Sequence, residues 1–318
     1  MYHGPIIDPH QHFWQPQQNP HPWLQPDAQI PFRYGNYEAI KRDYLPPDYL
    51  RDAATHRVEA TVYMEAEWDP AAPLSETRYI HQLAKRFGYP NAVIAQAWLD
   101  RTDVSEVLEW QAAYPLVRSV RHKPGGAASW QQARSGEHSL MSNPRWLNGY
   151  AELQKYALHF DLQTPWWHLD EACRLARDFP HTTLILNHCG LPADRSAEGL
   201  TAWRQAMSSL ADYENVAVKI SGLGERDHPW SVSRNQGIVR DTLAMFGTHR
   251  CMFASNFPVD SLCVTFDTLY TGFKKMVEHL PYDMQYRLFY DNALRYYRPT
   301  LSTAATPLKE NLRYVPSA

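Results

Sequence analysis

The sequence lacks any segment that would cross a membrane, and neither sign of charge is in excess. No apolar run reaches the roughly 18 residues of a membrane-spanning helix, and no basic stretch followed by an apolar one stands at the N-terminus. We therefore expect a soluble, cytoplasmic protein. The sequence has 31 lysines and arginines and 34 acidic residues, which gives a net charge of −3. This balance offers no broad basic surface and predicts neither a nucleic-acid nor a membrane partner.

Cysteines are scarce, and the sequence motifs of nucleotide-binding proteins are missing. Cys173, Cys189, Cys251 and Cys263 form no CxxC pair, which excludes a zinc ribbon or a disulfide framework and favours free thiols. Neither GxGxxG nor GxxxxGK[ST] follows a predicted strand, so the usual signals of a nucleotide-binding open sheet are absent. No internal repeat or low-complexity tract occurs.

The chain is rich in residues that build ordered loops. It contains 15 histidines, 11 tryptophans and 24 prolines, while the 44% hydrophobic and 20% charged residues are those of an ordinary globular protein. Aromatic and proline-rich loops on a rigid scaffold often carry function. The stretch Gln15–Pro47 is the longest of these and is expected to lie over the mouth of the fold, where a lid would sit.

Short β-rich runs recur along the chain, and amphipathic helical stretches separate them. Near-continuous apolar runs such as Thr183–Leu186 indicate strands that are buried on both faces of a parallel sheet. The predicted strands are Pro5–Asp8, Ala60–Glu65, Ala92–Leu99, Leu116–Arg121, Phe160–Thr164, Thr182–Asn187, Val216–Ile220 and Cys251–Ala254. The predicted helices are Ser75–Phe87, Leu169–Phe179, Trp203–Leu210, Ile238–Phe246 and Phe266–Leu280.

This alternation predicts a (β/α)8 TIM barrel of the α/β class, with an open doubly wound sheet as the alternative. We expect residues 1–299 to form a single domain with one long loop insertion after the first strand. Residues 300–318 are expected to form a C-terminal tail outside the barrel.

In such a barrel the chemistry lies at the carboxyl ends of the strands. His10 and His12 follow the first strand at positions i and i+2, which face the same side, so their rings can converge on a metal or a substrate. Glu65 and Glu67 share a face at the end of the second strand. One of these carboxylates is a candidate base or metal ligand, and the alternative is that both belong to the solvated start of a loop.

The fourth and fifth strands end in basic and aromatic residues. Arg121 and His122 point to opposite sides, so at most one of them faces into the barrel. An inward arginine offers a planar fork to a carboxylate or a carbonyl oxygen. Trp166 and Trp167 form a flat apolar wall, either for a substrate ring or for simple packing.

The last three strands end in further polar residues. His188 follows an apolar strand and marks a site, whereas Lys219 lies within a strand where its charge is costly to bury without a partner or a role. Asn256 and Asp260 follow the eighth strand on either side of Pro258, and Asp260 is a candidate either for catalysis or for capping the next helix.

Together these residues resemble the amidohydrolase-related (amidohydrolase 2) family, in particular its sugar-lactone hydrolases and pyrone-dicarboxylate lactonases. The resemblance runs from about Ile6 to Tyr297 and rests on Ile7–Trp14, Glu65, Arg121-His122, Asn187-His188, Val218-Lys219 and Met252–Pro258. It implies a distorted TIM barrel that opens a ring ester with water. It also implies that histidines surround the substrate, that basic side chains hold its oxygens, and that an aspartate after the eighth strand is the general base.

Two positions depart from the family pattern. Asn256 stands where the resemblance implies the aspartate, and Gln163 stands where it implies a histidine. An amide accepts no proton from water near neutral pH, and the same two positions supply metal ligands in the superfamily. What remains for a metal is His10 and His12, with Glu65 or His188. We therefore expect no cofactor, with a weakly bound zinc or manganese ion as the alternative.

The resulting hypothesis is a hydrolase that opens a small lactone, its partner being a small-molecule substrate and its state a monomer or homodimer. The predicted catalytic residues are Glu65, His188, Lys219, Asn256 and Asp260, with Glu65 ranked first as the base. The predicted substrate-binding residues are His10, His12, Trp14, Arg121, His122 and Trp166. A lactone isomerase, a decarboxylase of aromatic or unsaturated acids and an inactive binding protein are the alternatives.

Overall fold

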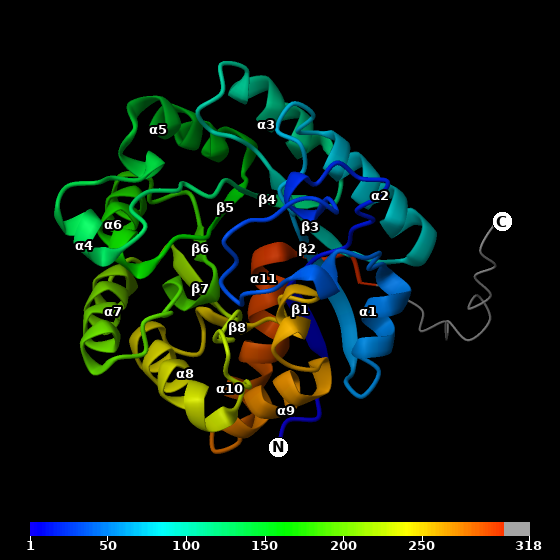
Figure 1. The fold of residues 1–318 in the computed structure, drawn as a ribbon, viewed down its shortest axis with the longest axis vertical. Helices are drawn as coiled ribbons and strands as arrows, with labels where there is room; N and C mark the ends of the chain where they lie inside the picture. The colour runs from blue at the N-terminus through cyan, green and yellow to red at the C-terminus, as the bar shows by residue number, and fades with distance from the viewer. Residues whose placement is uncertain (302–318) are drawn as a thin grey trace.

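A computed structural model of the chain describes residues 1–301 and confirms the predicted barrel (Figure 1). Eight parallel strands follow one another around the sheet in chain order. Their bounds are β1 Ile6–Gln11, β2 Val58–Met64, β3 Ala92–Gln96, β4 Val117–Arg121, β5 His159–Leu162, β6 Leu184–Leu186, β7 Val216–Ile220 and β8 Cys251–Phe253. The ends of β1 and β8 meet through a parallel bridge between Gln11 and Phe257 and a 2.8 Å hydrogen bond from the Asn256 amide to the His10 carbonyl.

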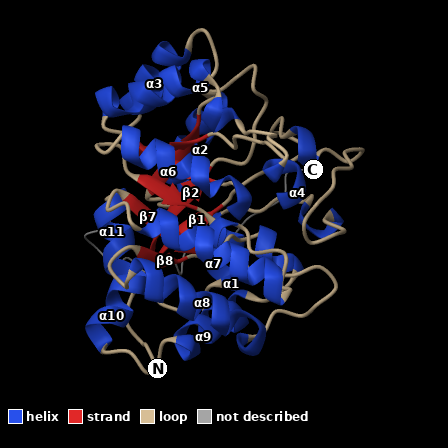
Figure 2. Ribbon diagram, turned by 90° about the vertical axis from the view of Figure 1, so that its left-hand side faces the viewer, coloured by secondary structure: helices blue, strands red, loops and turns tan. Residues whose placement is uncertain are grey.

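Most of the helices form a ring around the strands, which Figure 2 shows in the middle of the molecule, whereas α11 (Asn292–Tyr297) lies inside this ring in Figure 1. Their bounds are α1 Pro46–Asp52, α2 Ser75–Phe87, α3 Val104–Ala113, α4 Trp130–Arg134, α5 Pro144–Ala151, α6 Leu169–Asp178, α7 Ala197–Ala211, α8 Val232–Phe246, α9 Phe266–Met276, α10 Tyr282–Tyr286 and α11 Asn292–Tyr297. None of the helices in residues 1–301 is long and apolar enough to span a membrane.

Helices α7 and α8 begin well before the predicted positions, and their N-caps explain the difference. The hydroxyl of Ser196 accepts a hydrogen bond from the Gly199 amide, and Ser231 does the same for Arg234. These caps satisfy the free amide groups of each first turn. The first turn of α8 is mostly polar and that of α7 contains Glu198 and Gly199, so the hydrophobic pattern indicated only the later part of each helix.

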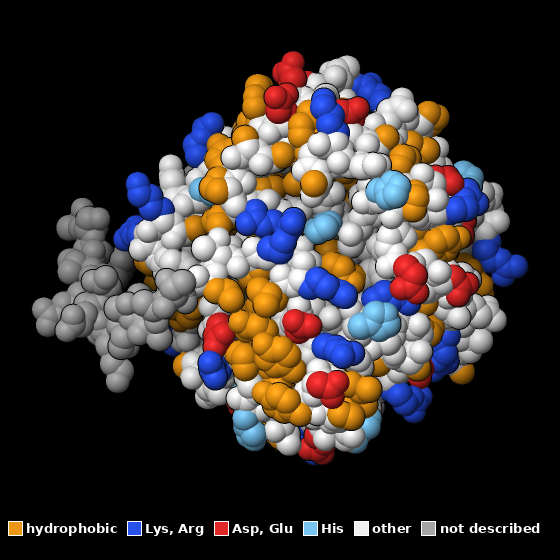
Figure 3. Space-filling view, turned by 180° about the vertical axis from the view of Figure 1, so that it is seen from behind, with side chains coloured by type: hydrophobic (Ala, Val, Ile, Leu, Met, Phe, Trp, Pro, Cys, Tyr) orange, Lys and Arg blue, Asp and Glu red, His pale blue; other side chains and the backbone are white. Residues whose placement is uncertain are grey.

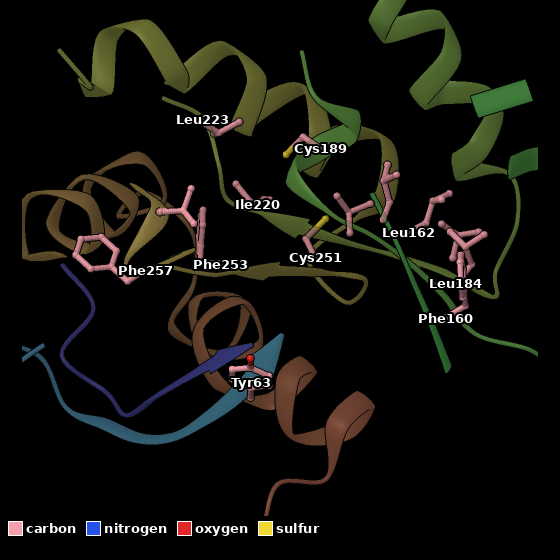
Figure 4. Close-up of a cluster of buried hydrophobic side chains, with 14 of the residues drawn as sticks. Tyr63, Phe160, Leu162, Leu184, Cys189, Ile220, Leu223, Cys251, Phe253 and Phe257 are labelled. Atoms are coloured by element: carbon pink, nitrogen blue, oxygen red, sulfur yellow. The ribbon is translucent and has the colours of Figure 1, made fainter. Parts of the chain in front are cut away.

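Alternating side chains of the strands face either the helices or the barrel interior. Figure 4 shows part of the outer layer, in which Leu184 and Ile220 pack with neighbours on β5 and β8. Ile185 and Ala217 instead belong to an inner cluster that also contains Tyr297 of α11. Because the period is two residues, the polar neighbours of outward-facing residues are directed into the barrel.

The loop insertion between Gln15 and Pro47 crosses the front of the barrel in Figure 1. Its aromatic side chains pack on one another, as in the stacked pairs Trp23–Phe32 and Phe32–Tyr37, with ring centroids 5.9 and 4.9 Å apart. The opposite face of the molecule carries charged side chains of both signs among hydrophobic ones (Figure 3).

The predicted C-terminal tail lies mostly outside the described residues. Its first residue, Thr300, pairs with Asn91, donating from its amide to the Asn91 carbonyl at 2.9 Å and accepting from the Asn91 side chain at 3.0 Å. Residues 302–318 belong to the part of the chain that the structure does not describe.

Candidate active site

A cavity of about 360 Å³ lies at the mouth of the barrel, among the ends of several strands. Four of its polar side chains, His12, Arg121, His188 and Asn256, follow or end β1, β4, β6 and β8. Its other lining residues are Trp23, Ile30, Pro31, Phe32, Arg33, Ala66, Glu67, Lys123, Gln163, Leu191 and Val259. The cavity therefore combines an apolar side from the loop insertion with polar groups from the barrel.

Three histidine rings gather at this mouth. The ring centroids of His10 and His12 lie 5.2 Å apart, and those of His10 and His188 lie 4.7 Å apart. The convergence of His10 and His12 expected from their spacing is thus present, although His10 is fully buried and lies behind the cavity wall. Burial lowers the pKa of all three imidazoles well below 6.5, and neighbouring cations lower them further. The three rings are therefore neutral at pH 7.

The hydrogen bonds of His12 fix its tautomer. Its Nδ1 lies 2.8 Å from the Met64 carbonyl oxygen, which only accepts, so the proton is on Nδ1. Nε2 is left with a lone pair as a hydrogen-bond acceptor. Trp14 stacks on the same ring at a centroid distance of 5.7 Å and holds it in place.

Arg121 and Glu65 form a buried ion pair beneath the cavity. The Nε–H group of Arg121 donates to the Glu65 carboxylate, and its Nη2 donates to the Glu65 carbonyl at 2.6 Å. The third bond runs from Nη1 to the Gln163 side-chain oxygen at 2.9 Å. The other carboxylate oxygen of Glu65 accepts the amide of Glu67 at 2.7 Å. Glu65 is therefore engaged in positioning Arg121, an arrangement that does not favour it as a base.

Asp260 is a buried carboxylate near the cavity, and one of its oxygens has no hydrogen-bond partner among the described residues. Its Oδ1 accepts hydrogen bonds from Asn256 Nδ2 at 2.7 Å and from the Tyr34 hydroxyl at 2.9 Å. Its Oδ2 is buried and has no hydrogen-bond partner among the described residues. Burial raises the pKa of Asp260, whereas the nearby Arg33 guanidinium has the smaller, opposite effect and lowers it. One turn beyond Asn256, the chain thus supplies a carboxylate directly behind the position where the resemblance implies one.

Lys219 lies in a layer below the cavity and does not line it. Its Nζ lies 2.7 Å from Asp161 Oδ1 and 4.7 Å from the centre of the Tyr297 ring, and both charged side chains are 0% exposed. Burial lowers the pKa of Lys219 to about 8, although Asp161 opposes the shift. A buried lysine within a strand needs a partner for its charge, and for Lys219 this partner is the Asp161 carboxylate inside the barrel.

Besides His10, three predicted substrate-binding residues lie outside the cavity. His122 points away from Arg121, and its Nδ1 accepts from the Leu99 amide at 3.0 Å and from Trp146 Nε1 at 2.9 Å. Trp14 is fully buried and reaches the loop insertion, where its Nε1 donates to two backbone carbonyls. Trp166 packs against the Trp130 ring at 5.2 Å. These contacts support packing for the three residues.

Sequence reasoning did not single out Arg33 or Lys123, which also line the cavity. Arg33 lies in the loop insertion, where no strand end or motif indicated a function, and its Nη2 comes within 3.9 Å of Asp260. Lys123 donates to Glu67 at 2.7 Å across the mouth. The available signal was a basic side chain, in a loop expected over the barrel for Arg33 and two residues beyond the end of β4 for Lys123.

The donor set at the mouth does not fit a tightly bound metal ion. His12 and His188 each use Nδ1 in a hydrogen bond, which leaves Nε2 of each ring for a ligand, and both ring nitrogens of His10 are without a partner among the described residues. No group of three or more His, Cys, Asp or Glu side chains within residues 1–301 is arranged to hold a metal. The nearby carboxylates of Glu65, Glu67 and Asp260 accept hydrogen bonds from Arg121, Lys123 and Asn256, respectively.

A (β/α)8 barrel with histidine, arginine and acidic side chains at its mouth is typical of enzymes. The comparison with protein families shows to which family this chain belongs. The chain matches the amidohydrolase family model over residues 7–298 and belongs to this family.

Similarity to individual proteins extends over nearly the whole chain. The chain is 36% identical to the uncharacterized protein y4mH of Sinorhizobium fredii, over 92% of this chain and 98% of that protein. It is 28% identical to the L-fucono-1,5-lactonase of Burkholderia ambifaria, over 92% and 95% of the two chains. Among solved structures, an amidohydrolase from Burkholderia multivorans with bound zinc has a TM-score of 0.77 at 24% identity, covering 93% of this chain and 100% of that one. This likeness shows the shared fold.

Proposed function

We propose that this protein hydrolyses a small lactone and that Asp260 is the general base. The observation that carries the proposal is the buried carboxylate of Asp260, with a free Oδ2, behind a cavity that presents Arg121 and neutral histidines. The family membership supports a hydrolase, and the similarity to an L-fucono-1,5-lactonase supports a lactone as the substrate class.

In the proposed reaction, Asp260 takes a proton from water while the water oxygen attacks the lactone carbonyl carbon. The Nε2 lone pair of His12 orients this water by accepting its second hydrogen. Arg121 donates three hydrogen bonds to Glu65 and Gln163, and its remaining N–H groups stabilise the oxyanion. Collapse of the tetrahedral intermediate breaks the ring C–O bond, and the departing alkoxide takes the proton from Asp260. The product is the open hydroxy acid.

Replacing Arg121 by methionine tests the assignment of the oxyanion donor. We expect kcat to fall on the order of 10²-fold, the usual effect of removing one such donor. Arg118→Met is a matched control on the same strand, since Arg118 contacts the Pro115 and Val117 carbonyls away from the cavity. Equal kcat values for the two variants would contradict the role of Arg121.

The proposed reaction proceeds without a tightly bound metal, because Glu65 and Asp260 are engaged in hydrogen bonds and no group of three or more His, Cys, Asp or Glu side chains within residues 1–301 is arranged to hold a metal. We therefore expect turnover to survive treatment with a chelator followed by its removal. Elemental analysis of the active protein would accompany this measurement. Activity that returns only with added zinc or manganese would overturn this part of the proposal and restore His10 and His12 as ligand candidates.

The function itself is tested by following acid release with a pH indicator. Purified protein would be assayed against sugar aldonolactones, pyrones and muconolactones, each with chelator, with zinc and with manganese. Acid release from one lactone class supports the proposal. Conversion of one lactone into another without acid release would identify an isomerase, and no conversion of any lactone would reject the proposal.

A further inference from the structure

A second cavity, of about 510 Å³, lies beside the candidate active site and shares Arg33 and Leu191 with it. Its walls come from the loop insertion and from the loops after β5, β6 and β7. The remaining lining residues are Pro165, Trp167, Pro192, Ala193, Arg195, Gly222, Gly224, Glu225 and Arg226. None of the proposed catalytic groups lines this space, so it is available to a part of the ligand remote from the reacting carbonyl.

Positive charge predominates in the second cavity. Arg33, Arg195 and Arg226 line it, whereas Glu225 is its only acidic lining residue within residues 1–301. The carboxylate of Glu225 is already held by Arg234, which donates from Nε at 2.8 Å and from Nη2 at 3.0 Å. The cavity therefore has more cationic than anionic groups available to a ligand.

Arg195 is the best-placed of these cations. Its Nη2 donates to the Leu223 carbonyl and the Asn235 side-chain oxygen, both at 3.3 Å, and these bonds hold the guanidinium in place. Its Nε and Nη1 atoms are buried without a hydrogen-bond partner among the described residues. A desolvated guanidinium with unused N–H groups is suited to donate hydrogen bonds to a carboxylate or phosphate oxygen.

Gly222 lies in the wall of the second cavity and packs closely against His188 and Arg33. A Cβ atom at this position would lie 2.6 Å from His188 Nδ1 and 2.7 Å from Arg33 Nη2. Any larger residue would therefore push against both side chains. Because Gly222 also has a φ of +61°, glycine suits this position for its backbone conformation as well as for its size.

We propose that the second cavity binds an anionic group of the substrate, a carboxylate or a phosphate ester, through Arg195 and Arg33. This inference rests on the proposed function and narrows its substrate class to lactones that carry an acidic substituent on the side remote from the ring ester. The apolar side chains of Pro165, Trp167 and Pro192 pack against the carbon chain that joins the two groups.

The test compares neutral lactones with the same lactones carrying a carboxylate or a phosphate. For Arg195→Gln we expect KM for the anionic substrates to rise about tenfold to a hundredfold, the effect of losing a charge-assisted hydrogen bond. KM for the neutral lactones and kcat for both should stay unchanged. Arg240→Gln, which alters a 74% exposed arginine of α8, is the matched control. Whether the carboxylated or the phosphorylated lactone shows the larger effect identifies the natural group.

A second variant and a binding measurement keep this inference separate from the proposed function. Glu225→Gln removes the opposing charge, so it should tighten the binding of inorganic phosphate and of malonate, measured by calorimetry without any turnover. If no lactone is hydrolysed but anion binding is lost in Arg195→Gln, the anion site stands and the lactonase proposal fails. If lactones are hydrolysed but neither KM nor anion binding depends on Arg195, the anion site is rejected.

Discussion

The Asp260→Asn variant should lose lactone hydrolysis by about 10²- to 10⁴-fold in kcat, the range expected when a general base is removed. The amide retains an oxygen that can accept the hydrogen bonds from Asn256 and Tyr34 that now hold Oδ1, so the fold should persist. Steady-state kinetics with the best lactone from the screen would measure the loss. A thermal unfolding curve recorded on the same preparation would show that the variant is folded.

The pH profile of the wild type provides an independent sign of the same role. A carboxylate acts as a base only when it is deprotonated, and burial raises the pKa of Asp260 above its ordinary value of 3.8. Consequently kcat/KM should fall as the pH is lowered through a pKa above that value. Burial and neighbouring cations lower the pKa values of His12 and His188 well below 6.5, so these histidines stay neutral near pH 7 and cause no change in rate there.

Asp283→Asn is a suitable control, since this carboxylate is 66% exposed and lies in α10, distant in sequence from the mouth residues. We expect wild-type kinetics from this control. Wild-type turnover in Asp260→Asn would instead assign the base to another group, of which His188 is the remaining candidate at the cavity. His188→Gln would then be the next variant to measure.

The fold could be predicted from the sequence because its cause is local. Apolar runs of the length of a strand, separated by amphipathic stretches such as Ser75–Phe87, reappear as strands and helices in the structure. The side to which Arg121 and His122 point also follows from strand periodicity, and they do face opposite ways. The positions of polar residues at strand ends likewise indicated where a site would form.

The partners of these residues could not be predicted, because contacts between distant segments determine them. From the sequence alone Glu65 is a plausible base, but in the structure its carboxylate is bound by Arg121, 56 residues further along the chain. Tyr34 lies 226 residues before Asp260, and only the path of the loop insertion brings them together. No local pattern shows which of several acidic side chains keeps a free oxygen.

The partner of Lys219 likewise could not be predicted from the sequence. A measurement of stability, and not of activity alone, tests whether this lysine has a structural role. Breaking its buried pair with Asp161 leaves one charge uncompensated, so Lys219→Met should lower the free energy of unfolding by about 3–5 kcal/mol. Asp161 also accepts hydrogen bonds from Tyr297 and Asn187, at 3.0 and 2.9 Å from Oδ1. Urea unfolding at pH 7 measures the loss, and the double variant Lys219→Met/Asp161→Leu, which removes both charges, should recover much of it.

The pH dependence of this loss has a definite sign. The pKa of Lys219 falls from 10.5 to about 8 on folding, so between these values the unfolded chain binds more protons than the native one. The contribution of Lys219 to the free energy of unfolding therefore increases with pH across this window, and Lys219→Met should remove that increase. A variant that keeps wild-type stability at every pH but loses turnover would contradict this account. The lysine would then have the catalytic role that its place in an apolar strand first suggested.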